Sequence, residues 1–181
     1  MMTNQQQDSE RLNKLLSVLK EYKSQIPVRE LRNALELHPV TLQDVEPYVK
    51  FQDDRYARNP IYRNPYFEML CLCWKSGQRS PIHDHLGSNC CVRIMEGSMT
   101  ATDFVRAASG FIKATRSFEM SPYTVSALES ADIHQMSNLQ ESGKHVITLH
   151  VYTYPQQTIN VYNLVDNKIT SLTFPQWQSE P

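Results

Sequence analysis

The sequence predicts a mainly β fold with short N-terminal helices packed outside it. Apolar residues recur with helical spacing before about residue 50 and with the alternating spacing of strands after about residue 56. Turn residues, mostly glycine or Asp-Asn, separate many short apolar runs in the second part. This pattern is typical of a small antiparallel barrel or sandwich. We expect one domain over 1–181, with a helical preface over 1–50 and a β-barrel over 56–174.

Three short helices are expected in the preface. Apolar residues at i, i+3, i+4 and i+7 over 12–22 predict an amphipathic helix that ends before Pro27. A second helix should cover 27–37, because proline suits a first helical turn. Thr41 and Asp44 resemble a capping box, which predicts a third short helix after them.

Eight strands are expected after the helices. The candidate runs are 67–74, 90–95, 99–106, 111–118, 124–128, 145–154, 159–165 and 168–174. The run 145–154 alternates clearly, with an apolar face of Ile147, Leu149 and Val151. Its other face carries Val146, Thr148, His150 and Tyr152. This second face is either a solvated outer surface or a set of polar groups bonded to one another or to a ligand.

The composition excludes several classes of protein. Lys+Arg number 18 and Asp+Glu number 19, so the net charge of −1 predicts no nucleic-acid or membrane partner. The apolar runs are far shorter than the about 20 residues that span a bilayer. The sequence starts with polar residues rather than a secretory signal, so a cytoplasmic location is expected. Nothing indicates an oligomer, and a monomer is expected.

The four cysteines lack the spacing of a disulfide framework or a zinc knuckle. They occur as C-x-C, at Cys71 and Cys73, and as C-C, at Cys90 and Cys91. On strands the first pair would share a face and the second pair would diverge. We expect reduced cysteines, with Cys71 and Cys73 half-buried.

A candidate metal site lies at His83 and His85. On an extended strand, two residues separated by a third project from the same face, so both imidazoles can reach one metal ion. Two ordinary surface histidines would show the same spacing. His134 becomes a third candidate only if the fold brings it beside this pair.

The segment around these histidines resembles the first motif of the cupins, small jelly-roll barrels that hold one metal. Its spacing is G-x5-H-x-H-x4-C-x6-G, with Cys90 where most cupins have a glutamate ligand. His134 and Asn138 match the end of the second cupin motif. Glu129 and Ala131 stand where that motif has proline and glycine.

Four blocks in order resemble the cysteine dioxygenase family. They are Tyr56-Ala57-Arg58-Asn59, Cys73-Trp74-Lys75-Ser76-Gly77, His83-Asp84-His85 and Leu149-His150-Val151-Tyr152. The run 167–174 is similar to the final hairpin of that family. The resemblance implies a cupin-type jelly-roll barrel and oxidation of the thiol of L-cysteine by O₂ to cysteine sulfinic acid, a step of cysteine catabolism towards taurine.

The resemblance also implies the roles of the site residues. Iron(II) would be held by His83, His85 and His134. Arg58 would bind the substrate carboxylate and Tyr56 would support it, because a guanidinium fits a carboxylate bidentately.

The polar face of the 145–154 run would lie beside the iron. There Thr148 would orient His150, and His150 would orient the Tyr152 hydroxyl, which also faces substrate. Trp74 would support these groups without contacting the substrate. Cys90 stands where animal-type members form a thioether link to the tyrosine that matches Tyr152.

Two departures from the family bear on the shape of the pocket. Tyr154 stands where the family often has proline, and Leu172 stands where a methionine is sometimes found. A related thiol dioxygenase acting on 3-mercaptopropionate or cysteamine is the first alternative, although Arg58 favours cysteine. A metal-binding cupin without dioxygenase activity is the second, since three histidines also suit zinc. A plain interaction module is the third.

Overall fold

The structure is a computed structural model that describes residues 9–175, so the ends of the predicted 1–181 domain lie outside the described residues. The helices are α1 (Glu10–Lys20), α2 (Val28–Leu37), α3 (Leu42–Val45) and the 3₁₀ turn η1 (Glu46–Tyr48). The strands are β1 (Ala57–Arg63), β2 (Glu68–Lys75), β3 (Asn89–Glu96), β4 (Met99–Arg106), β5 (Ile112–Met120), β6 (Val125–Leu128), β7 (Ile133–Ser137), β8 (His145–Thr153), β9 (Thr158–Tyr162) and β10 (Ile169–Thr173).

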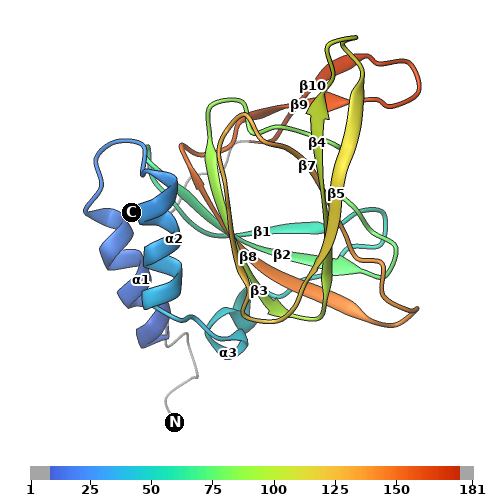
Figure 1. Ribbon diagram of the computed structural model, residues 1–181. Coiled ribbons are helices and arrows are strands. Elements are labelled where there is room, and N and C mark those ends of the chain that lie inside the picture. Colours follow the sequence, from blue (N-terminus) through green and yellow to red (C-terminus); the bar gives the residue numbers. More distant parts are fainter. Residues whose placement is uncertain (1–8, 176–181) are drawn as a thin grey trace.

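The strands form antiparallel sheets that give a mainly β, jelly-roll fold, as predicted (Figure 1). One sheet has the order β1-β2-β8-β3-β6, a second has β5-β4-β7, and β9 pairs with β10 as a hairpin. Within the described residues no hydrogen-bonded ladder closes these sheets into a barrel. Isolated bridges instead join His83, in the connection between β2 and β3, to His134 of β7 and to Val161 of β9.

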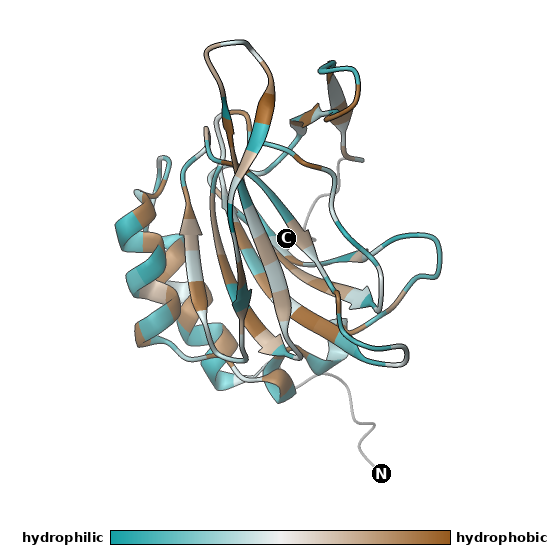
Figure 2. Cartoon of the chain, turned by 45° about the vertical axis from the view of Figure 1, so that its right-hand side comes forward, coloured by the Kyte–Doolittle hydropathy of each residue, from teal (hydrophilic) through white to brown (hydrophobic). Residues whose placement is uncertain are grey.

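Two apolar layers hold the fold together. In one layer, helices α1 and α2 pack on the outer face of the five-stranded sheet. Ile147, Leu149 and Val151 of β8 are part of that face. The other lies on the inner face of that sheet and includes Val146 and Tyr152 of the same strand. Figure 2 shows the matching alternation of apolar and polar residues along helices and strands. Both faces of β8 are therefore buried, and a solvated outer face for Thr148, His150 and Tyr152 is wrong.

The helix boundaries follow the capping residues. Ser9 Oγ accepts a hydrogen bond from the backbone N of Leu12 at 3.2 Å, which begins α1. Pro27 lies just before α2 rather than inside its first turn. The predicted capping box is confirmed, since the Asp44 carboxylate accepts a hydrogen bond from the Thr41 N at 2.6 Å. None of the described helices is both long and apolar enough to cross a membrane.

Two strands were not predicted, and both position the candidate site. Strand β1 contains Pro60, and a proline inside a run of residues argues against a strand. It is nevertheless accommodated, because β1 is an edge strand whose pairing with β2 shifts register between Pro60 and Tyr62. Strand β7 is only five residues long and mostly polar, so its alternation is hard to recognise. These two strands carry Arg58 and His134.

Candidate metal centre

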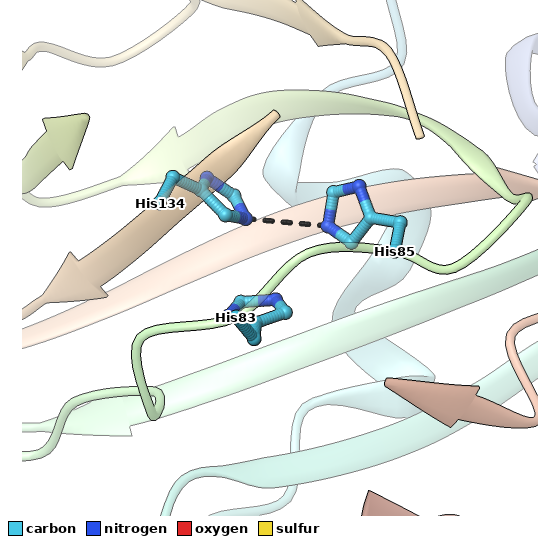
Figure 3. A group of neighbouring side chains, drawn as sticks. All are labelled: His83, His85 and His134. Atoms are coloured by element: carbon cyan, nitrogen blue, oxygen red, sulfur yellow. Dashed lines mark hydrogen bonds between the residues drawn. The ribbon is translucent and has the colours of Figure 1, made fainter. Parts of the chain in front are cut away.

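The fold brings the three predicted histidines together (Figure 3). His83 and His85 lie in the connection between β2 and β3, and His134 lies on β7. The backbone N of His83 donates to the His134 carbonyl at 3.0 Å, and the reverse bond measures 2.9 Å. One ring nitrogen from each histidine falls within 4.8 Å of the others, and the Nε2 atoms of His85 and His134 are 3.2 Å apart.

The segment that carries His83 and His85 is not one of the strands, and His83 makes isolated bridges to His134 and Val161. Asp84 between them points the other way, towards β9. Its carboxylate accepts hydrogen bonds from the Asn160 Nδ2 at 3.0 Å and from the Tyr162 hydroxyl at 2.7 Å. These bonds tie the segment to β9 and turn both imidazoles towards His134. Burial, reinforced by the Asp84 bond, raises the pKa of Tyr162 to about 12.

The three imidazoles are neutral at physiological pH, which metal ligation requires. Burial lowers the pKa of His83 to about 4 and lowers the pKa of His85 and His134 well below 6.5. The Nδ1 of His83 lies 3.0 Å from the Pro81 carbonyl. Since a carbonyl only accepts, this Nδ1 carries the proton and the Nε2 lone pair stays free.

The donor set fits a divalent metal ion. Neutral imidazoles are good ligands for iron, zinc and other transition metals. All three histidines are buried, and the Nδ1 of His85 has no hydrogen-bond partner among residues 9–175. Three neutral, buried nitrogen donors on one spot therefore form a three-histidine metal-binding site.

A hydrogen-bonded chain runs along the polar face of β8, on the side of the strand that the alternation predicts for Thr148, His150 and Tyr152. The Trp74 Nε1 donates to the Thr148 Oγ1 at 3.0 Å, and that oxygen lies 2.9 Å from the His150 Nε2. The Nδ1 of His150 is 3.0 Å from the Tyr152 hydroxyl oxygen. The Tyr152 ring lies 5.7 Å from the His85 ring, so the chain ends beside the metal ligands.

Cys90 and Tyr152 face each other across the β3–β8 ladder. The Cys90 Sγ lies 4.0 Å from the His150 Nδ1, the same atom that the Tyr152 hydroxyl approaches. Burial raises the pKa of both the Cys90 thiol and the Tyr152 phenol, so both groups are neutral. Cys91 packs on the helical side instead, as the divergence of adjacent strand residues predicts.

The four cysteines are free thiols, as expected, and all are buried. Cys71 and Cys73 share the helical face of β2, as predicted, but they are completely buried rather than half-buried. The helices that cover this face of the sheet account for the difference.

Arg58 lies at the edge of the same site. Its guanidinium carbon is 5.3 Å from the centre of the Tyr152 ring and 4.0 Å from that of Phe174. Burial acts to lower the pKa of Arg58, but Tyr152, Tyr56 and Glu68 raise it overall, so the side chain stays charged. Tyr56 stacks on Trp74 with ring centres 4.0 Å apart.

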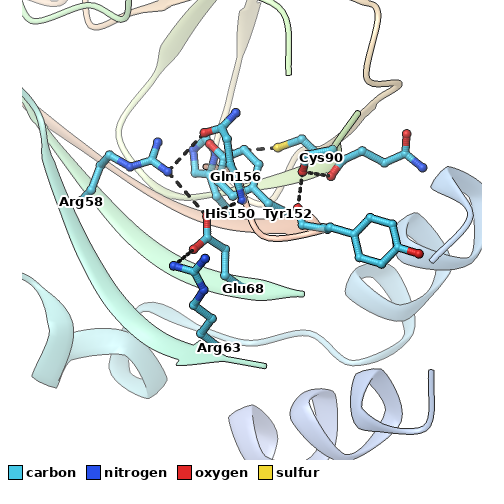
Figure 4. Close-up of polar contacts among 10 residues, drawn as sticks. Arg58, Arg63, Glu68, Cys90, His150, Tyr152 and Gln156 are labelled. Atoms are coloured by element: carbon cyan, nitrogen blue, oxygen red, sulfur yellow. Dashed lines mark hydrogen bonds and ion pairs between the residues drawn. The ribbon is translucent and has the colours of Figure 1, made fainter. Parts of the chain in front are cut away.

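Two residues that the sequence did not single out complete the Arg58 environment (Figure 4). Glu68 is only 2% exposed, and its carboxylate lies 3.8 Å from the Arg58 Nη2 and 3.7 Å from the Arg63 Nη1. The Arg58 Nη2 also donates to the Gln156 Oε1 at 3.2 Å. The backbone N of Gln156 donates to Glu68 at 3.0 Å.

A cavity of about 450 Å³ opens beside this cluster. Its lining includes Tyr56, Arg58, Glu68 and Gln156, together with Leu172 and Phe174 from the end of the chain. The 167–174 run therefore forms part of the pocket wall through β10. The peptide bond between Thr153 and Tyr154, two residues before Gln156, is cis.

Comparisons with known proteins point to one family of enzymes. The family described as Cysteine dioxygenase type I matches residues 3–164. Cysteine dioxygenase type 1 from Danio rerio is 28% identical over 143 residues, which cover 76% of this chain and 71% of that protein. The Bos taurus protein of that name is 26% identical, over 77% and 71%.

A solved structure supports the fold alone. The crystal structure of TT1209 from Thermus thermophilus aligns with a TM-score of 0.52 and 15% identity, over 64% of this chain and 99% of that one. The family match covers nearly the whole chain and includes all three histidines of the metal-binding site. This chain belongs to the cysteine dioxygenase type I family.

Proposed function

We propose that this protein is an iron(II)-dependent cysteine dioxygenase, which oxidises the thiol of L-cysteine with O₂ to cysteine sulfinic acid. The observation that carries the proposal is the buried three-histidine site with a charged arginine at its edge. The site offers a metal to the thiol and a cation to the carboxylate of L-cysteine, whereas cysteamine has no carboxylate to place there.

His83, His85 and His134 would hold the iron. Bound there, it would supply open coordination positions for the thiolate and O₂ and the redox chemistry between them. The three imidazoles bring no negative charge of their own, whereas most non-haem iron oxygenases include a carboxylate ligand. A site without that carboxylate favours an anionic ligand such as a thiolate.

The remaining residues bind and orient. Arg58 stays charged in its half-buried position and would bind the substrate carboxylate. Tyr152 has a neutral hydroxyl that His150 holds in place, and the Tyr152 ring lies 5.7 Å from that of His85. A neutral phenol next to a neutral imidazole can hold or pass a proton at the Tyr152 oxygen without leaving a charge unpaired.

Oxygen uptake by iron(II)-loaded protein tests this function, with L-cysteine, 3-mercaptopropionate and cysteamine compared side by side. We expect rapid uptake with L-cysteine and a product heavier by two oxygen atoms. Uptake only with another thiol would keep the site and change the substrate. Bound zinc in protein purified without added metal, with no oxygen uptake after iron loading, would favour a cupin of different chemistry.

Arg58→Gln should raise KM for L-cysteine about tenfold to a hundredfold, because it removes charged hydrogen bonds of about 1.5–3 kcal/mol. The value of kcat should change less, since the metal site is untouched. Steady-state oxygen uptake measures both constants. Arg116→Gln, on the exposed β5 surface, is the control. An unchanged KM in Arg58→Gln would exclude a carboxylate contact.

Cys90 and Tyr152 are expected to form a thioether during turnover. Their register across β3 and β8 and their shared approach to His150 support this expectation. The link replaces an S–H and a ring C–H by a C–S bond, and O₂ takes up the two electrons and two protons. Intact-mass analysis after turnover should show wild type lighter by two hydrogen atoms and Cys90→Ala without this loss. An unchanged wild-type mass would contradict it.

A further inference from the structure

The Gln156 side chain is buried beside Arg58, with one end bonded and the other without a partner. It is 3% exposed and lies between β8 and β9. Its backbone N donates to Glu68 at 3.0 Å, and its Oε1 accepts from the Arg58 Nη2 at 3.2 Å. A guanidinium can only donate, so the amide oxygen must face Arg58 and the Nε2 must be the other end.

The Nε2 of Gln156 has no hydrogen-bond partner among the described residues. Buried amide donors are normally satisfied, so such an atom indicates that an acceptor is missing. Gln156 and Arg58 line the same cavity. The oxygen and nitrogen of an amide are bonded to one carbon, as are the two oxygens of a carboxylate. The Nε2 of Gln156 is therefore about as far from its Oε1, which contacts Arg58, as one carboxylate oxygen is from the other. An oxyanion beside Arg58 would supply the missing acceptor.

Arg58 also presents a positive charge to this cavity. Its side chain is 19% exposed, and it shares the Glu68 carboxylate with Arg63 over N–O distances of 3.8 and 3.7 Å. A carboxylate on the cavity side would be stabilised by the Arg58 guanidinium.

We propose that Gln156 donates from its Nε2 to the carboxylate of the thiol substrate, next to Arg58. The residue thereby favours thiols that carry a carboxylate over thiols that carry only an amine. This inference rests on the proposed function and adds a specificity-determining residue to it. Glu68 acts as a positioning residue, because it holds the Gln156 backbone and leaves the amide aimed past Arg58.

Two substitutions test the contact. Gln156→Glu keeps the shape and the acceptor for Arg58, but it replaces the donor by a charged oxygen. Gln156→Leu removes donor and acceptor at similar volume. Gln157→Leu, at the exposed neighbouring position, is the matched control. L-cysteine and cysteamine, which lacks the carboxylate, are compared by steady-state kinetics and by calorimetric binding to the iron(II)-loaded protein without oxygen.

Loss of one charged hydrogen bond should raise KM and Kd for L-cysteine about tenfold in Gln156→Leu, and further in Gln156→Glu. The Kd for cysteamine should stay within about twofold of wild type in Gln156→Leu, which loses no contact to an amine. Gln157→Leu should match wild type for both ligands. Circular dichroism checks folding, and Gln156→Glu alone tests the proposal should the leucine variant misfold.

Two results would overturn the inference in distinguishable ways. Equal weakening of L-cysteine and cysteamine, or no change for either, would assign Gln156 a structural role while the proposed function stands. Wild-type protein that neither binds nor oxidises L-cysteine would overturn the proposed function and this role with it.

Discussion

His85→Ala should abolish oxidation of L-cysteine and weaken iron(II) binding by more than about a hundredfold. Loss of a residue that only supports a metal ligand typically weakens metal binding by up to about that factor, so loss of a ligand should weaken it more. The substitution removes one of three converging nitrogen donors. The other two cannot replace it, because His83 is held by the backbone bridge to His134. The measurements are iron content after dialysis and oxygen uptake with L-cysteine.

His145→Ala is the matched control for this experiment. His145 is exposed at the start of β8 and contacts Glu96 at 3.1 Å, away from the metal ligands. It should retain iron and activity at wild-type levels, while circular dichroism shows both variants folded. Full iron occupancy in His85→Ala would place the metal centre elsewhere.

The sequence predicted those parts of the site that depend on local geometry. The order of Thr148, His150 and Tyr152 along one face follows from the two-residue period of a strand, which holds wherever the strand is placed. The Thr41–Asp44 capping box is equally local, because both residues belong to one helical turn. Both predictions are confirmed.

The sequence could not predict which faces are buried. Polar residues on alternate positions of β8 are equally compatible with a solvated surface and with an interior face. Only the opposing sheet makes that face an interior one. The histidine site depends on the same tertiary packing. His83 and His85 belong to a connection, and the pairing of that connection with β7 brings His134 beside them.

Glu68 and Gln156 were missed for a related reason. Each contacts Arg58, yet Gln156 lies 98 positions away from it in the sequence. The strand period does place Glu68 on the same face of β2 as Trp74, and the register sets it opposite Tyr152 and opposite Arg63. Register was therefore the missing information, since alternation alone gives the face but not the partner.

Glu68→Gln should lower the free energy of unfolding by about 3 kcal/mol, the lower range for breaking a buried ion pair. The substitution keeps the shape of the side chain but removes the carboxylate that Arg58 and Arg63 share. The two arginine side chains are only 19% and 12% exposed, so water replaces that charge poorly. Urea unfolding monitored by circular dichroism gives the change from the midpoint and slope.

Asp103→Asn is the control for Glu68→Gln, because it breaks an ion pair of the same kind at the surface. Its partner Arg116 is 70% exposed, so the expected loss is below about 1 kcal/mol. The Glu68 loss should be the same with and without iron, since its carboxylate contacts arginines rather than the histidines. A loss as small as that of Asp103→Asn would mean that water screens the cluster, and Arg58 would then hold a carboxylate no more firmly than a surface arginine does.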